Sequence, residues 1–445
     1  MLTREPALSV GILEGYGNLR GHLDGTFLLN DGRRIDGPFS CTAGENTLHI
    51  TCSSGETVAG LADVTFSPVA PDASFLLDDV TIGVKFHWER KEPQRFRGGL
   101  RIMLRPGKGL TAINAVPLEE YLASVISSEM SASAPAELLR AHAITSRSWL
   151  VAMLERGRLV HTPRQPVEPI TPGTTEVIRW YSREDHDIFD VCADDHCQRY
   201  QGITKIISSA AADAIASTRG VFLVHDNTVC DARYYKACGG LTDNFPNSWE
   251  ETDIPYLRSI ADSPAQHPPI RSEGEMERWV LSSPEAYCNT RDPAILRQIL
   301  PSFDQETTDF FRWHVSYTRE ELEGLLRKKA GVDVGTLMDL VPVQRGPSGR
   351  LVRLRIVGTE RTLTVGKDLE IRRWLSPSHL YSSAFIVRTD RRDDGVPVKL
   401  TLYGAGWGHG VGLCQIGAAV MAVRGFSAEE IVRHYFRGAE LRKVY

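Results

Sequence analysis

The sequence predicts an α+β fold, in which a β-rich N-terminal part over residues 1–110 precedes a mixed α/β domain over residues 111–445. The first part alternates apolar and polar residues between turn signals, which is typical of half-buried strands. The second part opens with two adjoining helical patterns and ends in a glycine-rich run before an alanine-rich helix. Because 42% of the 445 residues are hydrophobic, the chain can build two or three packed units.

Strand signals recur along the N-terminal part. Residues 8–13 and 26–29 are apolar runs, and the second precedes Asn30-Asp31-Gly32, a typical turn sequence. Residues 81–86 form another such run, and the polar stretch 86–92 is interpreted as a charged edge strand or loop rather than a site. Further strand signals lead the chain into the first helix.

Two helical patterns meet at a small-residue elbow. The first begins after Pro117, which the first turn of a helix tolerates, and the second runs from Pro135 to about Leu154. Both carry apolar stripes, so we expect both in the core. Glu129 lies at the elbow between them. A carboxylate held there has a fixed direction and partial desolvation, which suits a general acid, whereas the alternative is a solvated glutamate at a helix end.

The rest of the second domain mixes structural types. Residues 157–183 lack periodicity and are predicted to form an exposed loop. The interval 271–400 is predicted to be a helical and β subregion. In the final run, glycine stands at nearly every second position, which indicates tight backbone turns or close approach of a ligand. Helices are expected over residues 203–217, 275–281, 293–300 and 319–329, and strands over 222–224, 232–235, 351–357 and 385–388.

Composition excludes some classes of function. The formal net charge of -5 gives the chain no overall attraction for nucleic acid. No run of residues reaches the length of a membrane span. The first residues lack the basic and apolar regions of an export signal, so the sequence gives no sign of export.

The eight cysteines are too sparse for a disulfide framework, but Cys192 and Cys197 lie close to His186 and His196. Two thiolates and an imidazole with an open fourth position suit zinc. The spacing is not a standard zinc-finger pattern. A disulfide between the two cysteines and a pair of free thiols therefore stay open as alternatives.

Three motifs follow one another along the second domain. The first combines Glu120-Tyr121-Leu122, Ser128-Glu129-Met130, Leu139-Arg140-Ala141-His142-Ala143 and Ser146-Arg147-Ser148. The second is Gly239-Gly240-Leu241-Thr242, and the third runs from Gly404 to Ala418 through Gly406-Trp407-Gly408-His409-Gly410. Together they resemble the signature of the stage II sporulation protein D (SpoIID) / LytB amidase-enhancer family, from Ala112 to Tyr445.

The resemblance implies a peptidoglycan lytic transglycosylase whose catalytic acid/base is Glu129. Such an enzyme cleaves the glycan between N-acetylmuramic acid and N-acetylglucosamine and leaves 1,6-anhydromuramyl ends, because the muramyl 6-hydroxyl is the nucleophile. It needs one carboxylate, whereas a hydrolytic glycosidase normally needs two. The other acidic candidates are interpreted as surface or capping groups: Asp190, Asp194, Asp195 and Asp243.

The resemblance also implies a glycan-binding groove, a metal site and a place of action. Zinc would be bound by His186, Cys192 and Cys197 as a structural ion, with His196 as the substitute ligand. The implied partners are peptidoglycan glycan strands and a cell-wall amidase, and the implied location is the cell envelope, in the periplasm or cell wall. The residues implied to bind substrate are Arg147, Tyr234, Lys236, Cys238, Gly239, Gly240, Thr242, His409 and Gln415.

Two rival functions stay open. One is a non-catalytic activator that binds peptidoglycan and enhances a cell-wall amidase. The other is a metal-dependent hydrolase at the cluster around Cys192, which is disfavoured because a cysteine-rich shell is typical of structural metal sites.

Cys238 and Cys414 stand where members of this family usually have serine. If the two motifs face each other, the two sulfurs lie close together. They are then either independent small side chains in a tight site or partners in a cross-link formed in an oxidising compartment.

Overall fold

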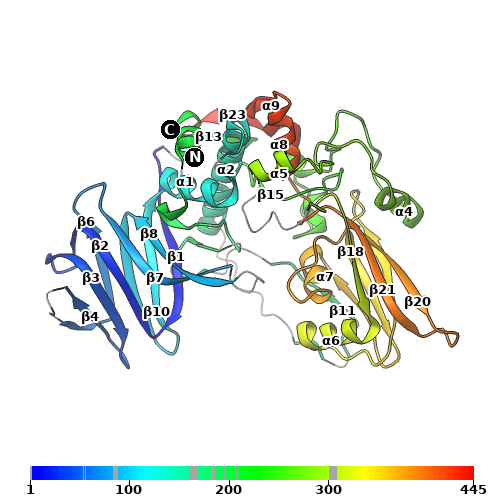
Figure 1. The fold of residues 1–445 in the computed structure, drawn as a ribbon, viewed down its shortest axis with the longest axis horizontal. Coiled ribbons are helices and arrows are strands. Elements are labelled where there is room, and N and C mark those ends of the chain that lie inside the picture. Colours follow the sequence, from blue (N-terminus) through cyan, green and yellow to red (C-terminus); the bar gives the residue numbers. More distant parts are fainter. Residues whose placement is uncertain are drawn as a thin grey trace.

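The computed structural model describes residues 3–53, 55, 57–83, 89–131, 133–159, 169–171, 173–181, 186–194, 196–206, 208–299 and 308–445. It places a β-rich part at one end, helices in the centre and a second β-rich part at the other end (Figure 1). The fold is therefore α+β with a β-rich N-terminal part, as the sequence predicts.

The N-terminal part is an 11-stranded sheet. Its main path runs β12-β1-β10-β9-β6-β2-β3-β4-β5, and β7 links β2 to β8. Buried and less buried residues alternate along strands such as β6, so one face forms the core. The strands are β1 (Ala7–Tyr16), β2 (Asn18–Leu28), β3 (Arg34–Ala43), β4 (Leu48–Cys52), β5 (Thr57–Leu61), β6 (Asp63–Pro68), β7 (Ser74–Ile82), β8 (Arg90–Arg97), β9 (Gly99–Arg105), β10 (Gly109–Pro117) and β12 (Val191–Cys192).

The charged strand predicted near residues 86–92 is partly visible. β8 pairs with β7 alone, so Arg90 and its neighbours form an edge strand. Residues 84–88 lie outside the described residues.

β10 delivers the chain directly into α1 (Leu118–Glu129). Pro117 caps this helix, and its first turn carries the acids Glu119 and Glu120, which the helix dipole favours there. After the elbow, α2 (Ala136–Leu159) runs beyond the predicted end at Leu154. Most of α1 and the first half of α2 are buried, as their apolar stripes predict.

The central part surrounds α2 with the ends of the chain. The strand β13 (Val221–His225) pairs with β14 (Thr228–Val229) and with the C-terminal β23 (Glu440–Lys443). One continuous apolar cluster extends from Leu8 in β1 to Ala439, so the N-terminal sheet and these helices share a core. The remaining elements here are η1 (Gly202–Lys205), α3 (Ser209–Ser217), β15 (Tyr234–Tyr235), η2 (Phe245–Asn247), η3 (Pro255–Leu257), α5 (Pro293–Ile299), β22 (Leu413–Cys414), α8 (Gln415–Val423) and α9 (Ala428–Tyr435).

The second β-rich part has its own core around the buried Trp374. One sheet has the order β11-β19-β18-β17, and another has the order β16-β21-β20. Its elements are β11 (Glu176–Ile178), α4 (Glu273–Leu281), β16 (Arg312–Thr318), α6 (Arg319–Ala330), β17 (Leu337–Arg345), β18 (Leu351–Gly358), β19 (Thr362–Gly366), α7 (Asp368–Trp374), β20 (Phe385–Arg391) and β21 (Pro397–Ala405).

Two sequence-based expectations need correction. The stretch 157–183 is not an exposed loop throughout, because α2 extends to Leu159 and Glu176–Ile178 pairs with β19, with Val177 buried. Residues 160–168, 172 and 182–185 lie outside the described residues. The single helix expected over 203–217 is a 3-10 turn, η1, followed by α3. In the part of the chain that the structure describes, no helix has both the length and the apolar character to cross a bilayer.

Candidate functional site

Glu129 is the last residue of α1, and its side chain is partly exposed. The helix ends there because Met130 adopts an extended conformation and packs into the core. The backbone N–H of Arg199 donates to Glu129 Oε1 over 3.3 Å. The structure thus places this carboxylate at the elbow that the sequence indicates, with one oxygen held by the backbone. Its catalytic role stays a prediction.

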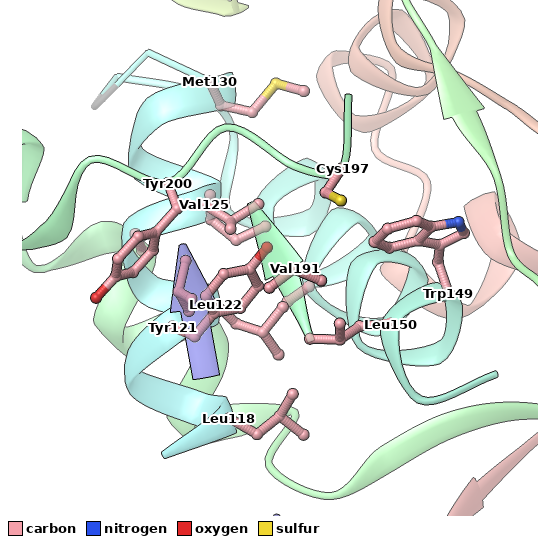
Figure 2. Packing of buried hydrophobic residues seen from close by; sticks show 14 of the residues in the cluster. Leu118, Tyr121, Leu122, Val125, Met130, Trp149, Leu150, Val191, Cys197 and Tyr200 are labelled. Carbon is pink, nitrogen blue, oxygen red and sulfur yellow. The ribbon is translucent and has the colours of Figure 1, made fainter. Parts of the chain in front are cut away.

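The segment that holds Glu129, residues 196–201, is itself fixed to α1. The ring of Tyr200 stacks on Tyr121 with centroids 5.0 Å apart, and its hydroxyl donates to Asn114 Oδ1 over 2.6 Å. Figure 2 shows Tyr200 beside Tyr121 of α1, within the apolar core. Because these contacts are buried, the segment has a defined position relative to the end of α1.

Four candidate metal ligands lie just before this segment and at its start. The ligand atoms of His186, Cys192, His196 and Cys197 lie within 4.8 Å of one another. His186 Nε2 is 3.3 Å from Cys197 Sγ, and His196 Nδ1 is 3.5 Å from the same sulfur. The resemblance implies His196 only as a substitute for His186. The structure shows that both side chains reach the cluster, so the donor set is two thiols and two imidazoles, which suits zinc.

The second and third motifs meet in the centre of the molecule. β15 and β22 pair as parallel strands, with Tyr234 opposite Leu413. Ala237 and Trp407 exchange two backbone hydrogen bonds of 3.0 and 2.7 Å. The expectation that these motifs face each other is confirmed.

Glycine is required where the two motifs touch. Gly239 and Gly406 have φ values of 79° and 74°, in the left-handed region. A Cβ atom on Gly239 would lie 2.8 Å from the backbone nitrogen of Gly406. At these positions the close neighbour is the protein's own backbone.

His142 of α2 contacts residues at this junction. Its ring lies edge-on to Tyr234, with centroids 4.5 Å apart. Gln415 Nε2 donates to His142 Nε2 over 3.1 Å, so the other ring nitrogen donates to Ser146 Oγ over 3.1 Å. Desolvation by complete burial lowers the pKa of His142 to about 3, which keeps the ring neutral. Nothing in the sequence analysis assigned His142 a role beyond the motif itself.

His409 is held as a neutral ring of defined tautomer. Its Nδ1 accepts the Val411 N–H over 3.1 Å, so Nε2 carries the hydrogen and donates to the Tyr234 carbonyl over 3.1 Å. Trp249 packs against the ring edge-on, with centroids 4.8 Å apart. These contacts fix the orientation of His409 while leaving part of it exposed.

Arg147 does not fit its assignment as a substrate-binding residue. Its side chain has no exposed surface. Arg147 Nη2 is 2.6 Å from Glu119 Oε2 and Nε is 3.0 Å from Oε1, so the two side chains form a bidentate ion pair. Nη1 also donates to the Val221 carbonyl over 3.2 Å. Arg147 therefore joins α1, α2 and β13 and is not accessible to a glycan.

The other implied groove residues divide into two groups. Tyr234, Lys236 and His409 keep some exposed surface. The buried group cannot contact a glycan in this conformation, because its polar atoms lie inside the protein; the Thr242 hydroxyl, for example, accepts the Ile260 N–H over 2.8 Å. The buried group consists of Cys238, Gly239, Gly240, Thr242 and Gln415.

Comparison with known proteins agrees with the three motifs. Residues 106–225 match the model of the family described as stage II sporulation protein, and residues 243–412 match a domain of unknown function. Stage II sporulation protein D of Bacillus amyloliquefaciens is 25% identical over 333 residues, which are 75% of this chain and 76% of that protein. The same protein of Bacillus subtilis is 24% identical over the same shares. The amidase enhancer of Bacillus subtilis is 22% identical over 241 residues, 51% of this chain and 32% of that protein.

The segment that matches the stage II sporulation protein model contains α1, α2 and the cysteine and histidine cluster. The chain is similar to stage II sporulation protein D over three-quarters of its length, as the motifs indicate.

Proposed function

We propose that this chain is a peptidoglycan lytic transglycosylase in which Glu129 alone acts as acid and base. The observation that carries the proposal is the hydrogen bond from the Arg199 backbone to Glu129 Oε1. It orients the carboxyl group at a partly exposed helix end, and within the described residues Oε2 has no hydrogen-bond partner. Oε2 is therefore the oxygen available to a substrate.

The other carboxylates weighed as partners have structural contacts. Asp190 accepts from the Ser9 hydroxyl over 2.7 Å, and the buried Asp243 accepts from Ser348 Oγ over 2.6 Å. Asp194 also has an interaction within the protein, and Asp195 lies outside the described residues. This supports chemistry that needs one carboxylate over hydrolysis, which normally needs two.

In the proposed reaction, protonated Glu129 gives its proton to the glycosidic oxygen as the bond to the muramyl C1 breaks. The muramyl 6-hydroxyl then attacks C1, and the Glu129 carboxylate takes the hydroxyl proton. The products are a free sugar hydroxyl and a 1,6-anhydromuramyl end, and the enzyme regains its starting protonation. Tyr234, Lys236 and His409 are the implied groove residues with surface left for binding the glycan.

Zinc is proposed as a structural ion at the cluster of His186, Cys192, His196 and Cys197. When bound, the ion would cross-link β12 to the turn that follows this strand. That turn leads into Arg199, whose N–H holds Glu129. The chain's own residues therefore connect this cluster to the orientation of the acid.

The decisive experiment replaces Glu129 with glutamine, whose amide matches the carboxyl group in size. We expect glycan cleavage to fall about 10²–10⁴-fold, since the amide cannot donate and recover a proton. Mass spectrometry would count anhydromuramyl ends released from glycan strands with and without stem peptides. Glu120→Gln, on the exposed side of the same helix, is the matched control and should cleave normally. Cleavage by Glu129→Gln at the wild-type rate would refute the proposal.

A second candidate function is enhancement of a cell-wall amidase without catalysis, favoured by the match to the amidase enhancer. In that case both glutamine variants would accelerate a wall amidase as well as wild type does. Either function places the proposed site of action in the cell envelope, on peptidoglycan glycan strands.

A further inference from the structure

A second group of metal-binding side chains lies in the centre of the molecule, at the junction of β15 and β22. Cys238, Asp262, Cys288 and Cys414 each offer one ligand atom, and these atoms lie within 4.8 Å of one another. None of the four residues is more than 2% exposed. In a tetrahedral site with zinc–sulfur bonds of about 2.3 Å, two sulfurs lie about 3.8 Å apart, a separation that falls within this limit of 4.8 Å.

The sulfur atoms receive hydrogen bonds that suit thiolates. The Gly240 N–H donates to Cys238 Sγ over 3.3 Å, and the Gly417 N–H donates to Cys414 Sγ over 3.4 Å. The Cys238 N–H donates to Cys414 Sγ as well, over 3.3 Å. A neutral thiol is a weak acceptor, whereas backbone donors around a metal-bound thiolate stabilise its charge.

The carboxylate is oriented in the same way. Asp262 Oδ1 accepts the Tyr435 hydroxyl over 2.6 Å, which leaves Oδ2 facing the sulfurs. Oδ2 lies 3.2 Å from Cys238 Sγ and accepts the Cys288 N–H over 3.1 Å. Second-sphere contacts of this kind hold a metal-ligating carboxylate in place.

Two arginines place positive charge close to the Cys238–Gly239 segment. Three thiolates and one carboxylate around a divalent ion carry a net charge of two negative units. Arg312 Nη1 donates to the Gly239 carbonyl over 3.0 Å, and Arg350 Nη1 donates to the Cys238 carbonyl over 3.3 Å. Arg350 is 1% exposed, so its charge acts on the cluster through protein rather than water. Arg350 also interacts with Asp243, whose carboxyl group partly offsets the positive charge of the guanidinium.

We propose that Cys238, Asp262, Cys288 and Cys414 bind one zinc ion in a structural site, distinct from the cluster near Glu129. On binding, the four side chains release to solvent the protons that they carry in the metal-free protein, because zinc is bound by thiolates and a carboxylate. Because the protein fills all four positions, the ion has no open coordination site for substrate.

The site joins residues inside the segment that matches the domain of unknown function to residues just outside it. Cys238 and Cys414 flank residues 243–412, whereas Asp262 and Cys288 lie within them. The zinc ion therefore ties the domain of unknown function to the two motifs on either side of it. This inference does not depend on the catalytic role of Glu129.

The test counts zinc in the purified full-length protein by elemental analysis. The double variant Cys192→Ser/Cys197→Ser removes the thiols of the first cluster, and we expect it to keep one zinc per chain. Its zinc K-edge absorption spectrum should show three sulfur neighbours at about 2.3 Å and one oxygen at about 2.0 Å. Cys288→Ser, made in the wild-type chain, should lose one zinc per chain. Cys230→Ser replaces another fully buried cysteine outside both clusters and should lose none.

Three results would overturn the proposal. One is a folded double variant that contains no zinc and takes none from a zinc buffer. Another is a Cys288→Ser protein with the wild-type zinc content. The third needs no variant: alkylation of denatured, unreduced wild-type protein should label every cysteine, and a disulfide between Cys238 and Cys288 or Cys414 would exclude the site. All three cysteines are free in the structure. The Sγ atoms of Cys238 and Cys288 lie 3.3 Å apart, whereas a disulfide bond is about 2.05 Å long.

Discussion

Replacing Arg147 with methionine should destabilise the core around α2 without removing a substrate contact. The change deletes the bidentate pair with Glu119, whose N–O distances are 3.0 and 2.6 Å, and leaves the carboxylate buried without its cation. Breaking such a pair costs about 3–5 kcal/mol. Glu119 keeps the Tyr445 hydroxyl at 2.7 Å and the Gly220 N–H at 3.3 Å, so we expect about 3 kcal/mol.

A double variant separates burial of the charge from loss of packing. Glu119→Leu alone should cost as much as Arg147→Met, since it leaves the guanidinium unpaired. Together the two changes remove both charges. The remaining cost is that of the Tyr445 hydroxyl and the Gly220 N–H, which lose their acceptor, and of the Val221 carbonyl, which loses the Arg147 donor. We expect the double variant to recover more than half of the loss.

The assay must be local, because a chain with two separate apolar cores does not unfold in one step. Hydrogen exchange at increasing urea concentration gives an opening free energy for each segment. Arg147→Met should lower it in α1, α2 and β13 and leave β18 unchanged. If α2 keeps its wild-type stability while glycan binding is lost, Arg147 contacts substrate and the structural reasoning is wrong.

Two further predictions concern His142 and Cys192. Because burial holds the pKa of His142 at about 3 against about 6.5 in the unfolded chain, the unfolded chain binds the extra proton, and stability falls as the pH drops from about 6.5 towards 3. By pH 5 the loss of stability is about 2 kcal/mol. Wild type should therefore lose about 2 kcal/mol more of the opening free energy of α2 between pH 7 and pH 5 than His142→Gln loses. Equal losses in the two proteins would contradict this. Cys192→Ser should lose one zinc per chain and lower the opening free energy of the residues around β12, while the rate of cleavage per folded molecule changes less. An unchanged opening free energy would argue against a structural ion.

The elements that could be predicted from the sequence are those with strong local patterns. The helices around Glu129 have apolar periodicity and proline at their starts, and the glycine-rich run leads into α8 as expected. The pairing of Tyr234 with Leu413 brings the second and third motifs together, which the sequence could offer only as a condition. Short strands were missed: β11 has three residues and β12 has two, too few to show a period.

Pairs that form only in the folded chain could not be predicted. Glu119 and Arg147 are both charged residues on helices, and only the crossing of α1 and α2 shows that they meet. Asp262 and Cys288 have no motif around them, and they lie 24 and 50 residues from Cys238. A ligand set drawn from four distant segments has no spacing signature, unlike the compact run from His186 to Cys197.

With zinc bound, the two cysteine clusters would affect different steps of the proposed reaction. The first fixes the turn leading to Arg199, whose N–H orients Glu129, and so bears on proton transfer. The second fixes the junction of β15 and β22, from which Tyr234 and His409 project, and so bears on glycan binding. A serine in place of Cys238 or Cys414 can still accept the backbone N–H groups that now point at sulfur, but it cannot supply a thiolate. Loss of the second ion should therefore weaken glycan binding while cleavage of bound glycan continues, whereas loss of the first should chiefly destabilise the turn that carries Arg199.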